Sequence, residues 1–353
     1  MRFPRRGRFL PFISLLALLL ILLGCTLNTG SIQSFAAGND GKCQSNCKLG
    51  TGVQNVQVFV EPDASDRIIT NAIAGAQQSV KLEIYLLTDR RIIAALEEAA
   101  RRGVDTRVML EPHPFGGGTP NKTLDQLNAA GVKAQTASSS FSLTHEKGMV
   151  IDEQTAYIMT ANFTYSALGG SNTTKNREYG IIDGNQADIE AVSAIFDADW
   201  NRSDAQFNDA NLVVSPVNAR QDFESLIASA QTSLLIEAEE MQDSDIEQAM
   251  VAAVQRGVQV QVIVPQPRAS GDSNSSGIAF IKQGGAQVRE DTMLYMHAKM
   301  MVVDGQVAFV GSENISTASL DRNREVGILI ADQAVLNTLQ QTFQQDWQDS
   351  QAA

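Results

Sequence analysis

Two stretches of the sequence carry the same polar pattern: HEKGMVIDEQTAYIMTAN at residues 145–162 and HAKMMVVDGQVAFVGSEN at residues 297–314. Each begins with a histidine, followed by a lysine two positions later, an aspartate five positions after the lysine, and an asparagine at its end. The chain contains only three histidines, and two of them begin these stretches. Because two matched copies are far more specific than one short motif, the pattern predicts a duplicated functional site.

The duplication extends well beyond these two stretches. A shift of 154 positions places Glu83 on Glu237, and the offset falls to 152 at the histidines and to 147 near the end of each copy. The changes in offset fall at predicted loops, where changes in length are tolerated. The sequence therefore predicts two copies of one α/β domain, at residues 55–205 and 206–353, and not a solenoid.

Each predicted copy alternates strands and helices. In the first copy, an apolar run from Val80 to Leu86 predicts a buried strand, and the following helix ends at Arg101-Arg102-Gly103, with basic residues in its last turn and a glycine as a stop. A second apolar run follows, from Val104 to Leu110. Strands that alternate with helices indicate a largely parallel sheet with helices on its faces.

Each histidine stretch is also expected to form a β-hairpin. The Asp-Gly pair at residues 304–305 lies between two apolar runs, which is a strong hairpin signal. If this pair forms a two-residue loop, counting outward along the strands places His297 opposite Ser312, on one face of the hairpin. The same count places His145 opposite Thr160. We therefore expect a hydroxyl beside each histidine.

The paired stretches resemble the HKD signature of the phospholipase D superfamily, whose two-domain members carry two copies. The resemblance implies two duplicated α/β domains related by a pseudo-twofold axis, each a mixed β-sheet flanked by helices, with one active site shared between them. It also implies phosphodiester chemistry. No metal or other cofactor is expected, because the sequence offers none of the clustered carboxylates or His/Cys spacings that a catalytic metal requires.

The residue types in the two stretches suit attack on a phosphodiester. Lys147 and Lys299 would supply positive charge at the phosphate. Histidine can act as nucleophile or as acid near neutral pH. The resemblance implies that His145 is the nucleophile, which forms a phosphohistidine, and that His297 is the general acid. Polar side chains at the ends of the two stretches are expected to bind the substrate: Thr160, Asn162, Ser312 and Asn314.

Two acidic pairs accompany the stretches. Related enzymes use a carboxylate placed as Glu178 and Glu325 are to hold the Nδ1–H of a catalytic histidine, which is a sensible physical role. The alternative is that each forms a surface salt bridge with the arginine before it in the sequence. Asp152 and Asp304 are interpreted as structural residues that form turns.

Residues 1–24 have the layout of an export signal, with four arginines followed by an apolar run of about 15 residues. This run is shorter than the roughly 20 residues that span a bilayer. Cys25 follows directly in a sequence that resembles a bacterial lipobox, which predicts acylation of Cys25 and a membrane-anchored lipoprotein of a bacterial cell envelope. The alternative is a secretory signal cut near residues 34–36, which would release a secreted protein.

Residues 25–54 are rich in Gly, Ser and Asn and are predicted to form a flexible tether. In an exported protein, Cys43 and Cys47 favour a small disulfide loop over a metal site. Removal of the four arginines of the signal would change the formal net charge from -13 to -17. A strongly acidic chain is a poor non-specific binder of nucleic acid.

Three classes of function are consistent with these features. The leading hypothesis is a lipid-anchored phosphodiesterase that hydrolyses phospholipid head groups outside the cytoplasm, as a monomer with an internal pseudo-dimer. An exported nuclease would use the same residues on nucleic acid, and a basic rim with stacking aromatics would favour it. A catalytically inactive binding protein would be expected to lack a histidine or lysine in one copy, and none is missing.

Overall fold

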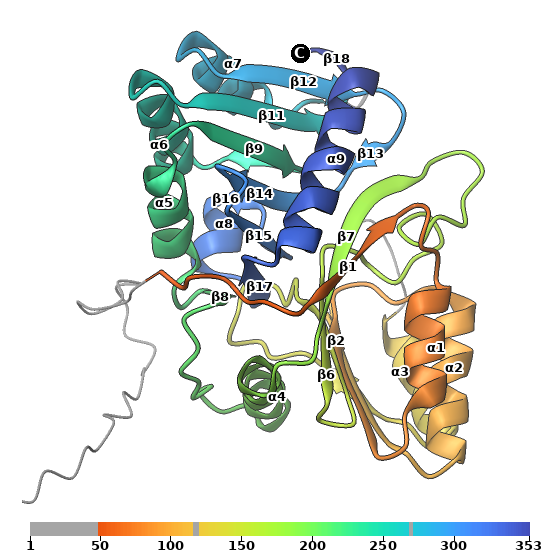
Figure 1. Cartoon of the computed structure of the whole chain (residues 1–353). Coiled ribbons are helices and arrows are strands. Elements are labelled where there is room, and N and C mark those ends of the chain that lie inside the picture. Colours follow the sequence, from red (N-terminus) through yellow and green to blue (C-terminus); the bar gives the residue numbers. More distant parts are fainter. Residues whose placement is uncertain (1–48, 116–119, 268–270) are drawn as a thin grey trace, which may run out of the picture. The chain divides into compact units, whose positions relative to one another are not determined.

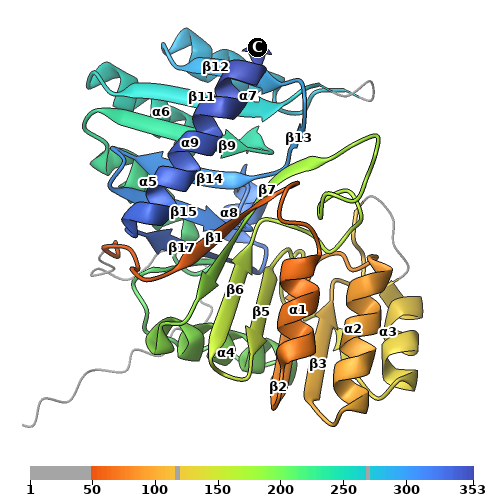
Figure 2. The same ribbon diagram turned by 45° about the vertical axis from the view of Figure 1, so that its right-hand side comes forward.

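The computed structural model describes residues 49–115, 120–267 and 271–353. The predicted export signal, the lipidation site Cys25 and the predicted disulfide between Cys43 and Cys47 lie outside the described residues. The described residues belong to one compact unit. It contains two mixed β-sheets of eight strands each, flanked by helices, as the duplication predicts (Figures 1 and 2).

The first sheet is built almost entirely from the first half of the chain. Its strands are, in order across the sheet, β1 (Gln57–Glu61), β7 (Asn176–Asp183), β6 (Thr155–Met159), β5 (Lys147–Ile151), β2 (Ser79–Ile84), β3 (Asp105–Leu110) and β4 (Lys133–Thr136). The eighth strand, β13 (Tyr295–Met296), comes from the second half and pairs with β7. The sheet therefore contains backbone from both halves.

The second sheet repeats the same order with strands from the second half. They are β18 (Gln351–Ala352), β12 (Gln287–Asp291), β11 (Gln259–Pro265), β9 (Ser233–Ala238), β14 (Lys299–Val303), β15 (Val307–Gly311), β17 (Glu325–Ile330) and β8 (Leu212–Ser215). A separate parallel pair joins β10 (Met241–Gln242) to β16 (Ile315–Ser316). The central strands of both sheets are buried on both faces, so their sequences are almost continuously apolar.

Helices cover both faces of each sheet. Those of the first half are α1 (Arg67–Gly75), α2 (Arg90–Arg101), α3 (Pro120–Ala129) and α4 (Gln186–Asn201). Those of the second are α5 (Ala219–Ser229), α6 (Ser244–Gln255), α7 (Ser275–Gln283), α8 (Thr317–Asp321) and α9 (Gln333–Asp349). In Figures 1 and 2, α1 to α3 form one outer layer beside the first sheet, and α5 to α7 form the equivalent layer beside the second. None of the helices among the described residues is long and apolar enough to span a bilayer.

Local sequence explains where these helices begin and end. Asp89 accepts hydrogen bonds from the backbone N–H groups of Arg91 and Ile92, which caps the N-terminus of α2. Gly103, just after this helix, has a φ of 91°, a left-handed conformation that glycine adopts without strain. The predicted end of this helix at Arg101-Arg102-Gly103 therefore agrees with the structure.

One hydrophobic core contains residues of both halves. Ile158 and Ile181 of the first sheet and Ile195 of α4 share it with Val310 of the second sheet and Phe343 of α9. Burial of a large apolar side chain contributes about 1.5–3 kcal/mol relative to exposure. The inner faces of the two sheets, with α4 and α9, are thus held together by a common core, while the outer helices pack into two separate cores.

The predicted hairpin register is wrong by one residue. In the second copy Val303 pairs with Val307, and in the first Ile151 pairs with Thr155. Asp304 and Gly305 do take positive φ values in the turn, but Gln306 is an extra, bulged residue that the two-residue loop did not include. Because a slip of one residue moves side chains to the opposite face, the hydroxyls do not lie opposite the histidines.

The end of the predicted flexible tether also differs from the prediction. Val53 is buried, and its backbone N–H and C=O bond to Leu329 O and Ala331 N, at 2.9 Å each. The backbone N–H of Gly52 donates to Asn211 Oδ1 at 3.0 Å. Residues 52–54 are therefore held against the second half, because their polar composition concealed one valine that packs into the core.

Candidate active site

The two histidine stretches meet where backbone segments of the halves exchange hydrogen bonds. The backbone N–H of His145 donates to Arg324 O at 2.9 Å, and that of His297 donates to Arg177 O at 3.3 Å. Each histidine is thus fixed at the backbone by the opposite half. The same segments continue into β5 and β14, which carry Lys147 two residues beyond the first histidine and Lys299 beyond the second.

Each imidazole also takes its carboxylate partner from the opposite half. His145 Nδ1 lies 2.8 Å from Glu325 Oε2, and His297 Nδ1 lies 2.9 Å from Glu178 Oε2. All four residues are buried. A carboxylate on Nδ1 orients the ring and directs Nε2 toward the substrate, as in other histidine-dependent sites. The two copies therefore form one composite site, in which neither half contains a complete histidine–carboxylate pair.

The alternative role for these carboxylates, a salt bridge with the preceding arginine, is not what the structure shows. Arg177 pairs with Asp346, with Nε–Oδ2 at 2.5 Å, and Arg324 pairs with Asp199, with Nε–Oδ2 at 2.7 Å. Both ion pairs are buried and also cross between the halves. Each arginine thus anchors the segment that presents the neighbouring glutamate.

Further hydrogen bonds fix the two glutamates. Glu178 accepts from Asn176 Nδ2 at 3.0 Å and from the hydroxyl of Thr160 at 2.6 Å. Glu325 accepts from Asn323 Nδ2 at 3.0 Å and from the hydroxyl of Ser319 at 2.6 Å. Outer contacts of this kind hold a ligand or catalytic group in its working orientation.

The predicted roles of the two hydroxyls need correction. Thr160 is fully buried and uses its hydroxyl on Glu178, so it is a positioning residue and not a donor to phosphate. Ser312 is also fully buried, and its Oγ accepts from the backbone N–H of Val326 at 3.1 Å. The one-residue shift of register places both outside the histidine face.

The amides of Asn162 and Asn314 differ from the hydroxyls. Each follows the second strand of its hairpin by three residues, and in the described residues neither Oδ1 has a hydrogen-bond partner. Asn314 is 6% exposed. A buried amide without a partner is costly, which is consistent with a group that meets its partner only when substrate binds.

The two lysines have different surroundings. Lys147 is 1% exposed, and its Nζ donates to His145 O at 2.5 Å and lies 5.3 Å from the centre of the Tyr85 ring. Burial, with repulsion from Lys299, lowers the pKa of Lys147 to about 7. Lys299 Nζ instead contacts a carboxylate, Glu239 Oε2, at 2.6 Å.

Titratable groups around His145 keep it neutral and its partner charged. Burial, followed by the positive charge of Lys147, lowers the pKa of His145 below its usual value. Burial alone would raise the pKa of Glu325, but His145 and Lys147 lower it below its usual range. A neutral imidazole with Nδ1–H donated to a carboxylate leaves a lone pair on Nε2, which is the form that a nucleophile requires.

Asp152 and Asp304 lie away from this chemistry. Asp152 accepts hydrogen bonds from the backbone N–H groups of residues 77–79, and Asp304 accepts from those of residues 231–233. Each has a positive φ in its hairpin turn. Each carboxylate thus ties the turn to the start of the adjacent strand, which is the structural role that the sequence indicates. The third histidine, His113, is exposed in a loop.

Glu239 is the site residue that sequence reasoning missed. Its Oε2 lies 2.6 Å from Lys299 Nζ and 3.3 Å from His297 Nε2, and its Oε1 accepts from the hydroxyl of Tyr295 at 3.1 Å. The signal was available, because the shift of 154 positions that aligns the halves places Glu239 on Tyr85. A carboxylate opposite an aromatic residue marks a position where the copies differ.

The expectation that the chain has no clustered carboxylates is also wrong. Glu83, Glu146 and Asp199 are all buried, with ligand-type oxygens within 4.8 Å of one another. They come from two strand segments and from α4, so no sequence spacing revealed them. The cluster lies around the ion pair of Asp199 with Arg324, and burial raises the pKa of Glu146 to about 8. These carboxylates are therefore prone to hold protons near neutral pH.

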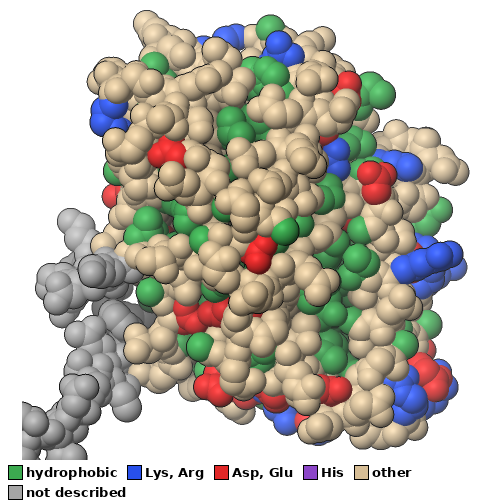
Figure 3. Space-filling model, in the orientation of Figure 1, with side chains coloured by type: hydrophobic (Ala, Val, Ile, Leu, Met, Phe, Trp, Pro, Cys, Tyr) green, Lys and Arg blue, Asp and Glu red, His purple; other side chains and the backbone are tan. Residues whose placement is uncertain are grey.

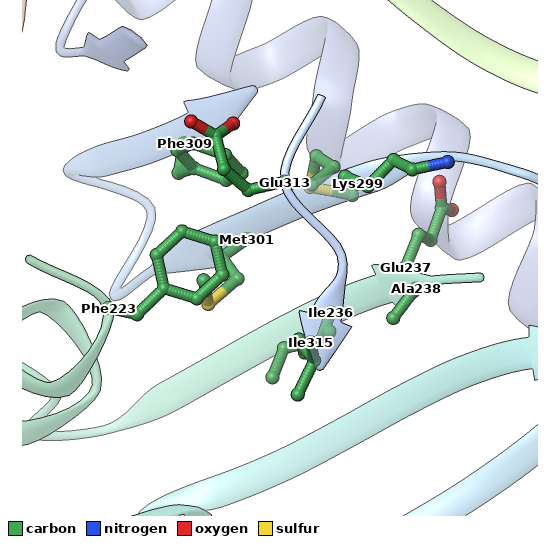
Figure 4. A pocket seen from close by; sticks show the side chains of 10 residues that line it. Phe223, Ile236, Glu237, Ala238, Lys299, Met301, Phe309, Glu313 and Ile315 are labelled. Carbon is green, nitrogen blue, oxygen red and sulfur yellow. The ribbon is translucent and has the colours of Figure 1, made fainter. Parts of the chain in front are cut away.

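A small internal cavity lies beside Lys299 (Figure 4). Its volume of 10 Å³ has room for about one water molecule. Apolar side chains, including Phe223 and Phe309, surround it together with the buried carboxylates of Glu237 and Glu313. The cavity is too small for a phosphodiester substrate and lies within the packed interior of the second half.

The reciprocal histidine–carboxylate pairs, two lysines and duplicated sheets define a class of phosphoryl-transfer site on an α/β scaffold. A family model described as "Cardiolipin synthase, PLD-like domain" matches residues 69–200 and 223–347, which is more than half of the chain. The chain belongs to the phospholipase D superfamily.

Similar proteins include two cardiolipin synthases. The probable cardiolipin synthase YwiE of Bacillus subtilis (strain 168) is 23% identical over 344 residues, which cover 84% of this chain and 67% of that protein. Cardiolipin synthase B of Salmonella typhi is 24% identical over 336 residues, covering 82% of this chain and 79% of that protein. A solved structure of phosphatidylserine synthase from Haemophilus influenzae Rd KW20 has a TM-score of 0.66 and 15% identity, and the likeness covers 86% of this chain and 88% of that one. The structural likeness shows the shared fold.

The crossed carboxylates predict separable effects of two matched substitutions. Glu325→Gln and Glu178→Gln should each lower kcat by about 10²–10⁴-fold with little change in KM, because the amide no longer stabilises a charged or attacking imidazole. With an activated phosphodiester that needs no acid, Glu178→Gln should still form a phosphohistidine at normal rates, whereas Glu325→Gln should not. Quenched-flow measurement of the covalent intermediate would check this, with Glu98→Gln on exposed α2 as control. Equal loss of the intermediate in both variants would contradict the crossed pairing.

The pKa of Lys147 predicts a specific pH dependence. The ammonium is charged below its pKa of about 7 and loses its charge as the pH rises through that value, so kcat/KM for an anionic substrate should fall above neutrality. Lys147→Arg keeps its charge over this range and should move the alkaline limb to higher pH, even if its rate at pH 6 is lower. Lys122→Arg, on the exposed part of α3, is the control. An unmoved alkaline limb in Lys147→Arg would assign that limb to another group.

Proposed function

We propose that this chain is a phospholipase D-type phosphodiesterase that hydrolyses the head-group phosphodiester of membrane phospholipids. The observation that carries the proposal is the composite site, with two buried imidazoles held by crossed carboxylates beside two lysines. The names of its relatives supply the substrate class, since they are cardiolipin synthases. The amides of Asn162 and Asn314 are free to contact phosphate oxygens.

The geometry supports a two-step reaction through His145. In the first step the Nε2 lone pair attacks phosphorus, the N–P bond forms, and the P–O bond to the head group breaks with its electron pair on the departing oxygen. The proton on His297 Nε2 passes to this oxygen. Lys147 and Lys299 compensate the negative charge of the phosphate oxygens during the transfer. In the second step water attacks phosphorus, the N–P bond breaks, and His297 recovers a proton from the water.

A second candidate function is transfer of the phosphatidyl group to an alcohol. The specific observation in its favour is that curated relatives covering 82–84% of this chain are named as synthases. The two reactions share the first step and differ only in the acceptor that attacks the phosphohistidine. Exclusion of water favours an alcohol, and the histidines of this site are only 7% and 9% exposed.

Charge favours a lipid over nucleic acid as substrate. The formal net charge is -13, and affinity for nucleic acid depends largely on Lys and Arg contacts with phosphate. On the face shown in Figure 3, Lys and Arg side chains are scattered among acidic and apolar ones and do not form a continuous basic patch. A nuclease would be expected to line the approach to its site with basic and stacking groups.

For localisation, we propose that the enzyme acts outside the cytoplasm, tethered by a lipid at Cys25. The support comes from the sequence alone: four arginines, a short apolar run, and a cysteine directly at its end. A lipid anchor would hold the site next to its substrate and raise the effective substrate concentration.

The function is tested with the purified full chain in detergent-lipid micelles. Phosphatidylcholine, phosphatidylglycerol, cardiolipin and single-stranded DNA are offered side by side, with and without glycerol, and the products are resolved by mass spectrometry. We expect phosphatidic acid from at least one phospholipid, and a phosphatidyl-alcohol if transfer occurs. His145→Ala and His297→Ala should each lower turnover roughly 10³-fold or more, because the two residues act as a unit. Cleavage of DNA alone, or about half the activity in each single variant, would overturn the proposal.

The anchor is tested by Cys25→Ser. We expect this variant either to be released from the membrane fraction or to accumulate as an unprocessed precursor, because the acylated residue is lost. Membrane fractionation and metabolic labelling with a fatty-acid analogue report the two outcomes. Unchanged labelling and processing would rule out the lipobox. A Cys43→Ser variant serves as control for the loss of a cysteine.

A further inference from the structure

The structure assigns Glu239 a catalytic role: its carboxylate keeps His297 protonated in the free enzyme and so makes His297, and not His145, the acid. This inference rests on the proposed function, because it divides the roles of the two histidines in that reaction. It starts from a difference between the copies. The position of Glu239 in the second half is occupied by Tyr85 in the first.

His297 is held between two carboxylates. Glu178 contacts its Nδ1, with Oε1 at 2.8 Å and Oε2 at 2.9 Å, while Glu239 Oε2 lies 3.3 Å from its Nε2. Neutral imidazole has one N–H and one lone pair, so only one of its nitrogens can donate to a carboxylate. Only the imidazolium donates from both nitrogens. Two carboxylates on opposite edges of one ring therefore favour the charged form.

His145 has different neighbours. Its Nδ1 contacts Glu325, but the other side of the ring meets the edge of Tyr85, with ring centres 4.7 Å apart. The hydroxyl of Tyr85 contacts the backbone N–H of Phe115 and is thus engaged away from the imidazole. Among the described residues, no carboxylate forms an ion pair with His145 Nε2. The aromatic neighbour leaves this nitrogen free for attack on phosphorus.

Glu239 also marks where a phosphate oxygen binds. Its Oε2 contacts both His297 Nε2 and Lys299 Nζ, the two groups that must meet the phosphate and the leaving oxygen. Burial alone would raise the pKa of Glu239, but His297 and Lys299 hold it well below its usual range. An arriving phosphodiester exchanges one anion for another at these donors. The substrate thus meets an imidazole that already carries the proton to be transferred.

Other charged groups face this pair and set the baseline for any titration. Lys299 opposes protonation of His297, whereas Glu178 and Glu239 favour it. The hydroxyl of Tyr295 donates to Glu239 at 3.1 Å. Four more distant titratable residues of the site surround them: His145, Lys147, Glu240 and Glu325. Because these groups are unchanged in a Glu239 variant, a shift on its substitution reports the one carboxylate.

The experiment is a histidine NMR titration of the full chain. With only three histidines, selective ¹⁵N-imidazole labelling gives three sets of signals, which His113→Ala helps to assign. Glu239→Gln should lower the measured pKa of His297 by about 1–3 units, the usual effect of removing an opposite charge within 4–6 Å, and leave that of His145 nearly unchanged. Glu240→Gln, the neighbouring carboxylate, is the matched control. Unaltered titration of His297 in Glu239→Gln would overturn the inference.

A kinetic arm separates a catalytic role from a structural one. With a natural phospholipid, Glu239→Gln should move the alkaline limb of kcat to lower pH by the same interval. With an activated ester whose leaving group needs no proton, its rate of phosphohistidine formation at His145 should stay within about threefold of wild type. Glu239→Tyr, which reproduces the first half, should behave like Glu239→Gln. Equal losses with both substrates, or a phosphohistidine at His297, would refute the assignment. The NMR result does not depend on turnover, so failure of the proposed function is recognised separately.

Discussion

The exchange of backbone and side-chain contacts between the Asn-Arg-Glu segments and the opposite histidines is the constraint on which the rest of the structure depends. Arg177 and Arg324 each use their carbonyl on the histidine of the other half and their guanidinium on an aspartate of the other half. The neighbouring glutamate then has its imidazole within reach. Because all these groups are buried, separating the halves would leave charges unpaired in a low-dielectric interior, at a cost of several kcal/mol for each.

This constraint explains why the site is composite. A histidine and its carboxylate in the same half would allow each domain to work alone, whereas crossed pairs couple folding of the interface to assembly of the site. The same interface carries the shared apolar core of both sheets, α4 and α9. A change that loosens the interface is therefore expected to act on both imidazoles together.

The sequence predicted the duplicated fold and the reactive side chains, because spacing and apolar periodicity are local properties. It did not predict the crossing, since His145 and Glu325 are 180 positions apart, and His297 and Glu178 are 119 apart. The resemblance supplied a carboxylate for each histidine but not its partner. The hairpin register failed on a single bulged residue, which placed Thr160 and Ser312 wrongly. Composition likewise concealed Val53, whose neighbours are polar.

Duplication gives two equal histidines, yet the reaction needs one neutral and one charged. A few substitutions at aligned positions supply the difference. Glu239 stands where the first half has Tyr85, and it adds a carboxylate to His297 alone. In the other direction, the first half has Glu146 where the second has Ala298, so negative charge collects behind the strand that carries His145, around Glu83 and Asp199. That charge lies within the buried cluster, on residues prone to protonation, while the carboxylate at Glu239 stays ionised against Lys299. The copies share a scaffold, and the placement of these acidic side chains divides the work between them.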